Sequence, residues 1–183
     1  MSEKEKMRSG QLAKVSDPEL MADLSKAKML MAKINTMYLG SPDLREVLDE
    51  LLPNIHATAK VCPPFFCDYG YNIELGEHVF INFNCVILDG APVKIGNHTL
   101  LGPSVQIYTP QHPMDYMQRR EPVESAHPVT IGDDCWIGGG AIICPGVTIG
   151  NRCIIGAGSV VTKDVPDDSL AVGNPAAVKR KLS

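Results

Sequence analysis

The sequence predicts a mainly β protein, a three-sided parallel β-helix with a helical segment at its N-terminus. Two observations carry this prediction. From Leu75 onward an aliphatic residue recurs at every sixth position, and small residues dominate two of the positions between. Before that, apolar residues recur at spacings of three and four, as they do on one face of an α-helix. At 183 residues, the chain can form one main domain with an appendage.

The N-terminal segment, residues 1–56, is expected to contain two helices. Ser16 and Glu19 form a predicted capping box for the first, and Pro18 suits its first turn. A second, short helix is expected after the start signal Ser41-Pro42-Asp43, with Pro53 ending it. The first helix has one apolar face, made of Leu20, Leu24, Ala27, Met31 and Ile34.

Residues 57–183 are expected to form the β-helix, because the six-residue period fits neither the 3.6 residues of an α-helical turn nor a coiled-coil heptad. Strands and turns must alternate instead. Stacked coils then pair in parallel at about 4.8 Å, so that equivalent aliphatic residues form ladders inside the stack. The earlier run slips by two residues after Ile87, which predicts an irregular corner. The repeat positions are Leu75, Ile81, Ile87, Ile95, Leu101 and Ile107, and then Ile131, Ile137, Ile143, Ile149, Ile155 and Val161.

Residues 108–130 interrupt the repeat with prolines and charged residues, and we expect them to form a protruding loop. Loops longer than about 12 to 15 residues are uncommon in compact domains and are often functional. His112 lies in this loop between Pro110 and Pro113, which restrict its backbone. A lone histidine in a loop is often only a solvated side chain, but a braced imidazole at the only large break in the repeat suits a general base.

Composition excludes several classes of function. The net charge of -4 is mild and spread along the chain, which argues against nucleic acid and membrane surfaces as partners. The sequence has no apolar stretch of the roughly 18 residues that a membrane span needs, and its charged start is followed by no apolar signal region, so we expect a cytoplasmic protein. Six cysteines without a CxxC pair are expected to be reduced. Cys135 and Cys153 should stack one coil apart, where a disulfide is geometrically feasible but two packed thiols are favoured.

Several motifs together are narrower than the repeat alone. With them, the chain resembles the sugar O-acetyltransferases, the maltose, galactoside and nodulation-factor acetyltransferase group, and most closely the maltose O-acetyltransferase branch. The resemblance covers nearly the whole chain. It implies a left-handed β-helix, acetyl-CoA as co-substrate, no metal, and a homotrimer with each active site in a cleft between neighbouring subunits. The motifs are Cys67-Asp68-Tyr69-Gly70, Asn82-Phe83-Asn84-Cys85, His112-Pro113, Trp136-Ile137-Gly138, Pro145-Gly146-Val147 and Gly173-Asn174-Pro175.

The resemblance also implies roles for individual residues. His112 would be the general base, and the backbone N–H of Gly139 would stabilise the developing oxyanion. Asp68 and Asn82 would bind the acceptor, with Asp89 as a weaker candidate, although Asn82 also fits a simple turn residue. Trp136 would either cover the thioester or lie in the trimer contact. Coenzyme A would contact Gly139, Ala157, Thr162, Lys163 and Arg180.

The predicted reaction is acetyl transfer to a hydroxyl of a sugar such as maltose, glucose or a galactoside. A non-sugar small alcohol or an antibiotic is the alternative acceptor. A zinc hydratase on the same scaffold would need three converging histidines, and His78, His98, His112 and His127 do not recur at a coil spacing that would leave a metal with a fourth, open position. A purely structural solenoid would have no need of a His-Pro loop beside a groove of small residues.

Overall fold

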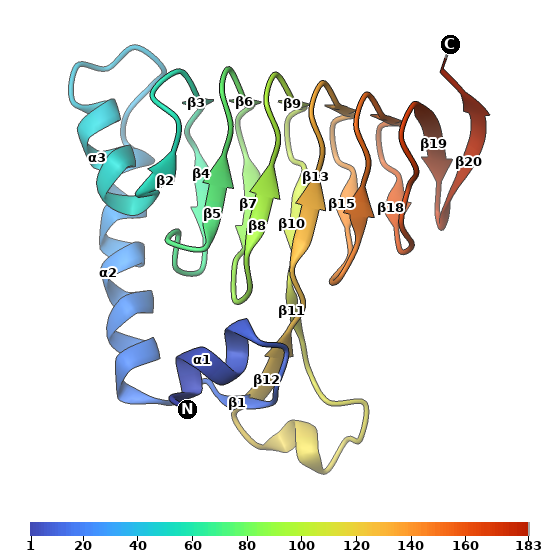
Figure 1. The fold of residues 1–183 in the computed structure, drawn as a ribbon. Coiled ribbons are helices and arrows are strands. Elements are labelled where there is room, and N and C mark those ends of the chain that lie inside the picture. The colour runs from blue at the N-terminus through green and yellow to red at the C-terminus, as the bar shows by residue number, and fades with distance from the viewer. Residues whose placement is uncertain (183) are drawn as a thin grey trace.

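A computed structural model describes residues 1–182 and contains a parallel β-helix with three sides (Figure 1). Side 1 is a sheet of β2 (Asn54–Ile55), β5 (Ile73–Leu75), β8 (Val93–Ile95), β13 (Val129–Ile131) and β16 (Thr148–Ile149). Side 2 contains β3 (Lys60–Val61), β6 (Phe80–Ile81), β9 (Leu100–Leu101), β14 (Trp136–Ile137), β17 (Ile154–Ile155), β19 (Ser169–Gly173) and β20 (Ala176–Lys181). Side 3 contains β4 (Phe65–Cys67), β7 (Cys85–Leu88), β10 (Gln106–Tyr108), β15 (Ile142–Ile143) and β18 (Val160–Val161).

The repeated aliphatic residues form the core, as the sequence predicts. The chain visits the three sides in turn, and the strands of successive coils pair in parallel. Leu75 pairs with Ile95 on side 1, and Ile81 pairs with Leu101 on side 2. All twelve predicted repeat residues from Leu75 to Val161 are at most 3 % exposed. Burial of one aliphatic side chain per strand therefore holds strands that are only two to four residues long.

The first coil begins before the repeat becomes visible in the sequence. Ile55, Val61 and Cys67 occupy the positions that Leu75, Ile81 and Ile87 occupy in the next coil. The β-helix thus starts at Asn54, slightly before the predicted boundary at residue 57. The pattern was missed because a cysteine stands at one inward position, where it packs as a small apolar side chain.

Every insertion into the repeat leaves the same edge of the prism, between side 3 and side 1, which we call the 3/1 corner. Residues 68–72 and 89–92 follow β4 and β7 there, and the long insertion at 109–128 follows β10. The predicted slip after Ile87 is the second of these. All three irregular segments therefore lie one above another in successive coils.

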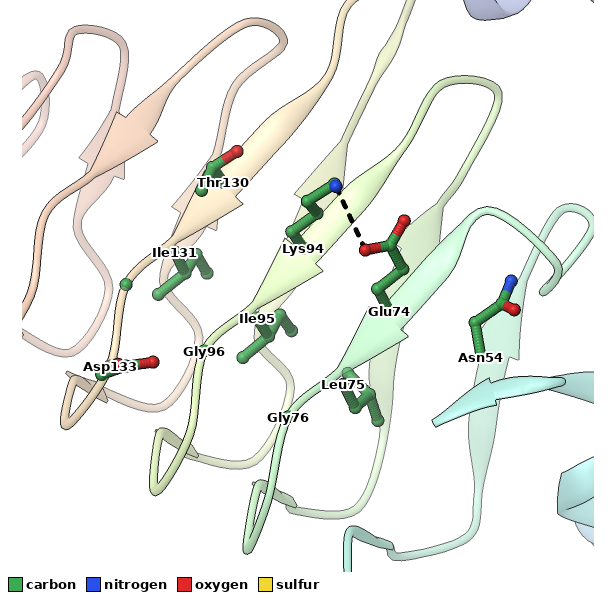
Figure 2. A pocket seen from close by; sticks show the side chains of 11 residues that line it. Asn54, Glu74, Leu75, Gly76, Lys94, Ile95, Gly96, Thr130, Ile131 and Asp133 are labelled. Atoms are coloured by element: carbon green, nitrogen blue, oxygen red, sulfur yellow. Dashed lines mark ion pairs between the residues drawn. The ribbon is translucent and has the colours of Figure 1, made fainter. Parts of the chain in front are cut away.

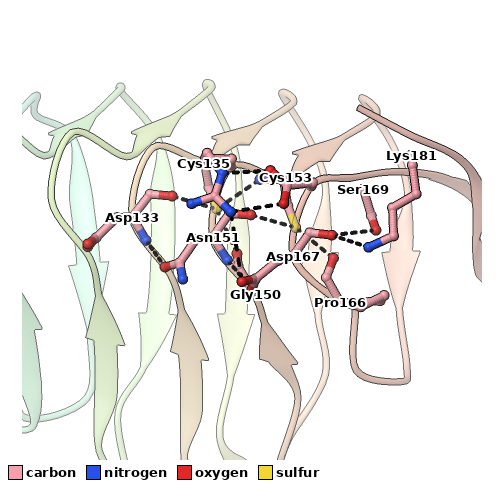
Figure 3. Close-up of polar contacts among 11 residues, drawn as sticks. Asp133, Cys135, Gly150, Asn151, Cys153, Pro166, Asp167, Ser169 and Lys181 are labelled. Carbon is pink, nitrogen blue, oxygen red and sulfur yellow. Dashed lines mark hydrogen bonds and ion pairs between the residues drawn. The ribbon is translucent and has the colours of Figure 1, made fainter. Parts of the chain in front are cut away.

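The edge between side 1 and side 2, the 1/2 corner, is regular and is held by a ladder of Asn and Asp side chains (Figure 3). The Oδ1 atom of Asn151 accepts the Asp133 N–H at 2.8 Å, and the Oδ1 atom of Asp167 accepts the Asn151 N–H at 2.8 Å. Cys135 and Cys153 lie behind this ladder as thiols, donating to the carbonyl oxygens of Gly150 and Pro166. The ladder satisfies turn amides that no strand pairing reaches.

The N-terminal segment has three helices rather than two: α1 (Glu3–Arg8), α2 (Pro18–Ile34) and α3 (Leu44–Leu51). α2 and α3 cover the N-terminal end of the stack (Figure 1). The capping box predicted at Ser16 is wrong, because Asp17 is the N-cap and accepts the Glu19 N–H at 3.0 Å. A true capping box, Ser2 with Glu5, starts the unpredicted α1. No helix within residues 1–182 has the length and apolar character to cross a bilayer.

The long insertion is not a simple loop. It contains β11 (Pro110–Gln111), a 3-10 turn (Gln118–Arg120) and β12 (Val123–Ala126), with β11 and β12 paired antiparallel. The short strand β1 (Ala13–Lys14) pairs with the other edge of β12. We call residues 1–15, which comprise α1 and β1, the N-terminal arm. The arm and the insertion thus form a small sheet beside the stack (Figure 1).

Candidate active site

His112 directly follows β11 and lies at the 3/1 corner, where its side chain is 64 % exposed. It faces a cavity of about 420 Å³ that is open to solvent. The walls come from five parts of the chain: the segment after β4, strand β7, strand β10, the insertion, and the turn after β15. The lining residues are Asp68, Leu88, Tyr108, Pro110, His112, Glu124 and Pro145. The structure therefore brings two carboxyl groups to the predicted base.

Glu124 is the carboxyl group nearest to the imidazole. Its Oε2 atom lies 3.9 Å from Nε2 of His112, and its side chain is 19 % exposed. Burial raises the pKa of Glu124, and the neighbouring His112 lowers it in part. In the sequence, Glu124 is only one of several charged residues in the insertion. Its position opposite His112 depends on the β11–β12 hairpin, which the proline-rich sequence did not indicate.

Asp68 lies on the opposite wall of the cavity. Burial, together with the charges of Asp89 and Glu124, raises the pKa of Asp68 to about 7. Near neutral pH this carboxyl group is therefore divided between its acid and its anion. A protonated carboxyl group can donate a hydrogen bond as well as accept one, so Asp68 can bind either kind of polar partner.

Asp89 lies beneath this wall and does not reach the cavity. Its side chain is completely buried, and its carboxylate accepts backbone N–H groups from Asp68 at 3.1 Å, Tyr69 at 2.9 Å, Gly70 at 2.7 Å and Asn72 at 3.2 Å. The expected direct contact of Asp89 with an acceptor does not fit this burial. Asp89 instead fixes the irregular segment that carries Asp68.

A second group of predicted residues lies on another edge, the 2/3 corner between side 2 and side 3. Asn82 follows β6, Gly139 follows β14, and Ala157 follows β17 at equivalent turns. The Oδ1 atom of Asn82 accepts the Phe83 N–H at 2.9 Å, which leaves its NH₂ group available. Within residues 1–182, the N–H of Gly139 donates to no protein acceptor, while its carbonyl accepts the Gly158 N–H.

Thr162 and Lys163 lie on the same edge as His112, two coils further along the stack. They line a groove of about 390 Å³ together with Ala176, Ala177 and Val178 of β20. Small side chains on this wall leave room for a slender ligand. Arg180 is also on β20 but pairs with Leu170 and does not line the groove.

The structure therefore sorts the predicted residues onto two edges of the prism. Asp68, His112, Thr162 and Lys163 lie along the 3/1 corner, while Asn82, Gly139 and Ala157 lie along the 2/3 corner. The whole width of side 3 separates the two rows. A base on one edge and an oxyanion donor on the other edge of the same chain are too far apart to act on the same reacting atoms.

Side 1 and side 2 contain none of the catalytic candidates in their strands. Side 1 has a depression of about 690 Å³, which carries the Glu74–Lys94 ion pair at 3.2 Å and no histidine (Figure 2). Trp136 points outward from side 2 between Leu100 and Ile154 and is 55 % exposed. It does not line the cavity at His112.

Two of the four histidines lie one coil apart. His78 and His98 stand one coil apart at the 1/2 corner, with ring centroids 5.0 Å apart. The early coils are 20 residues long rather than 18, as the pairing of Ile87 with Ile107 shows. The spacing of 20 between the two histidines therefore corresponds to one coil. Among residues 1–182, no three His, Cys, Asp or Glu side chains converge as metal ligands would.

Comparison with known proteins agrees with this architecture. The profile described as bacterial transferase hexapeptide (six repeats) matches residues 128–163. Nodulation protein L of Rhizobium meliloti (strain 1021) is 50 % identical over 183 residues, covering 97 % of this chain and 98 % of that protein.

Solved structures of other acetyltransferases are similar over the full length of this chain. A maltose O-acetyltransferase from Clostridium difficile 630 superposes with a TM-score of 0.97 at 43 % identity, covering 100 % of this chain and 98 % of that one. A hexapeptide-repeat acetyltransferase from Vibrio cholerae O1 biovar eltor, in complex with acetyl coenzyme A, superposes with a TM-score of 0.92 at 43 % identity, covering both chains completely. With half of its residues identical to a relative over almost its full length, the chain belongs to the hexapeptide-repeat acetyltransferase family.

Proposed function

We propose that this protein transfers the acetyl group of acetyl-CoA to a hydroxyl group of a sugar, with His112 as the general base. The observation that carries the proposal is the exposed imidazole of His112 in a cavity with two carboxyl groups, at the one large break in the solenoid within residues 1–182. Acetyl-CoA is the expected donor because a relative of 43 % identity has been solved in complex with it.

The reaction needs a base and an oxyanion donor. An alcohol is a weak nucleophile at neutral pH, so His112 removes its proton as the oxygen attacks the thioester carbonyl. The carbonyl oxygen then carries negative charge, which the free N–H of Gly139 stabilises. Loss of one such donor typically costs about 2.7 to 4 kcal/mol of transition-state stabilisation. The tetrahedral intermediate collapses with cleavage of the C–S bond, coenzyme A leaves as the thiol with the proton that His112 took up, and the acetyl ester remains on the acceptor.

The base and the oxyanion donor come together only if neighbouring copies share a site. In a ring of three chains, the 3/1 corner of one copy faces the 2/3 corner of the next, and the same contact repeats until the ring closes. The outward residues next to the 2/3 corner support such contacts, because large apolar side chains are exposed there: Phe66, Phe83, Leu100 and Trp136. In this arrangement Trp136 belongs to the subunit contact.

Coenzyme A would run between two copies. Thr162 and Lys163 of one copy and Gly139 and Ala157 of the next would line its path, with the ammonium group of Lys163 near a phosphate. Arg180 is exposed on β20 and would reach the nucleotide end from outside the groove. A slender pantetheine arm fits the small side chains of this groove.

The acceptor would lie in the cavity of His112, with Asp68 of one copy and Asn82 of the next holding hydroxyl groups beside the reacting one. Such groups favour sugars. A polar atom of the site that pairs with a sugar hydroxyl is left without a partner when the acceptor lacks that hydroxyl, and such an acceptor binds less well. The relative named maltose O-acetyltransferase supports a sugar acceptor. The six unpaired thiols within residues 1–182 support a reducing compartment, the cytoplasm.

The experiment that tests this proposal is an acceptor screen with acetyl-CoA, following the released thiol, on the parent and on His112→Ala. We expect turnover of at least one sugar by the parent and a loss of a hundredfold or more in the variant, within the typical 10² to 10⁴ for a general base. A parent that acetylates no sugar would reject the acceptor class. Equal turnover by parent and variant would reject the role of His112.

A further inference from the structure

We infer that Lys4 of α1 is a positioning residue for acetyl transfer, because its ammonium group ties the N-terminal arm to the segment that carries Asp68. The arm and that segment support opposite walls of the His112 cavity, so one ammonium group holds both walls in place. The inference rests on the proposed function of this cavity. It assigns a role to a residue that does not itself line the cavity.

Lys4 lies in a cage of two carboxyl groups and one aromatic ring, all of them outside the arm. Its Nζ atom lies 2.7 Å from Oδ2 of Asp23 and 3.6 Å from Oε1 of Glu19, both on α2. The same atom lies 4.1 Å from the centroid of the Tyr71 ring. An aromatic face attracts an ammonium group, more strongly when the group is partly withdrawn from water. The Lys4 side chain is 26 % exposed, so the cage is suited to hold a cation.

Tyr71 connects this cage to the wall of the cavity that contains Asp68. Its ring stacks on the ring of Tyr69, with the two centroids 5.5 Å apart. The backbone N–H groups of Asp68 and Tyr69 donate to the same carboxylate oxygen of Asp89, at 3.1 and 2.9 Å. Asp68 and the two tyrosines therefore belong to one tightly bonded turn, and a shift of Tyr71 is transmitted to Asp68.

The arm connects Lys4 to the opposite wall. Met7 lies one turn further along α1, is 1 % exposed, and packs in one cluster with Tyr69 and with Ala126 of β12. α1 contacts both α2 and β12 (Figure 1). The arm also pairs through β1 with β12, the strand that contains Glu124. Within residues 1–182, the ion pairs of Lys4 are the only ones that link the arm to the rest of the chain.

A second lysine of the same helix provides a matched control. Lys6 pairs with Glu3 at 2.6 Å, so its ion pair lies wholly within the arm. Lys4→Met and Lys6→Met remove the same charge from the same helix and retain a long side chain. Only the first of these changes breaks a contact with the turn that carries Asp68.

The kinetic test compares these two variants and Lys4→Arg in the intact protein. In Lys4→Met we expect kcat/KM for the acceptor to fall roughly tenfold, mainly through a higher KM, because small displacements of binding groups are costly. The KM for acetyl-CoA should equal that of the parent, since the groove at Thr162 and Lys163 does not touch the arm. A general loss of structure would raise both KM values alike.

The charge-conserving variant is expected to recover the activity. Lys4→Arg keeps a cation that can stack on an aromatic ring and pair with a carboxylate, so it should regain most of the lost rate. Lys6→Met should equal the parent. Unchanged acceptor kinetics in Lys4→Met, or an equal loss in Lys6→Met, would overturn the inference.

Amide hydrogen exchange tests the same connection without turnover. In Lys4→Met we expect the amides of residues 9–15 and 68–72 to exchange roughly fivefold faster than in the parent, from loss of an ion pair and a cation–π contact. The amides of residues 136–155 should be unchanged. Equal exchange in Lys4→Met and Lys6→Met would overturn the inference. A parent that acetylates no acceptor would reject the proposed function, while the exchange rates would still decide whether Lys4 joins the arm to the Asp68 segment.

Discussion

Ala13 of β1 stands opposite Glu124 of β12 in an antiparallel pair. Two residues further along the arm, the Val15 N–H donates to the carbonyl oxygen of Pro122 at 2.9 Å. Because hydrogen-bonded pairs alternate in such a ladder, Ala13 and Glu124 are a hydrogen-bonded pair as well. The N-terminal arm therefore holds the strand that forms one wall of the His112 cavity.

The first prediction concerns this arm. Ala13→Pro removes the N–H that pairs with Glu124, and it should lower acetyl transfer by roughly tenfold or more, since small displacements of catalytic groups are costly. The main unfolding transition should remain close to that of the parent, because Ala13 packs in a small cluster separate from the core of the stack. Lys14→Ala, which keeps its backbone N–H and its bond to Glu3, is the matched control. Full activity in Ala13→Pro would show that the arm does not position the cavity.

The second prediction concerns Asp89. Asp89→Ala leaves four backbone N–H groups without their acceptor, and an unsatisfied buried group costs about 1 to 3 kcal/mol. We expect a loss of about 3 kcal/mol or more in the free energy of unfolding, measured by urea denaturation, because several of these groups lie out of reach of water. Asp164→Ala removes an exposed carboxylate that accepts one N–H, from Thr148, and should cost only about 1 kcal/mol. Similar losses in the two variants would contradict the proposed role of Asp89 in fixing the Asp68 segment.

The third prediction is a pH dependence at Asp68. Its pKa in the folded protein, about 7, lies above the usual value near 3.8, so the folded state binds the proton more tightly than the unfolded state. The associated stability is fully present below about pH 4 and is lost as the pH rises toward 7. Asp68→Asn should therefore be more stable than the parent at pH 8, by about 2 kcal/mol. This is half of the free energy that corresponds to the full pKa difference, because the group is partly solvated.

The gain in Asp68→Asn should shrink to nearly zero at pH 4, where the parent carboxyl group is protonated. Urea unfolding of both proteins at pH 4, 6 and 8 measures this trend. A stability difference that stays constant over this range would contradict the raised pKa of Asp68.

Local patterns in the sequence predict most of the fold. The ladders from Leu75 to Val161 follow from the six-residue period alone, since each coil buries residues close together in sequence. His112 stands out because the period breaks around it. The repeat positions of the first coil were not identified, since Cys67 and the Pro63-Pro64 pair mask the repeat at Ile55 and Val61.

The features that escaped prediction depend on contacts between distant parts of the chain. Ala13 and Glu124 are far apart in sequence, and no local pattern reveals that β1 pairs with β12. The burial of Asp89 under four amides likewise depends on the stacking of two irregular turns in successive coils. For this reason the sequence alone does not show that Asp89 is buried or that Glu124 lies beside His112.

The central claim is that the base and the oxyanion edge belong to different copies of the chain. It is tested most directly by mixing His112→Ala, which lacks the base, with Asn82→Ala, which lacks an acceptor-binding group and should also lose activity, refolding them together, and measuring acetyl transfer by the mixed oligomers. A shared site is intact wherever a chain with His112 adjoins a chain with Asn82, so random mixing into threefold rings predicts about a quarter of the parental activity. If oligomers shown by mass to contain both variants are as inactive as each variant alone, the account of a site shared between copies is wrong.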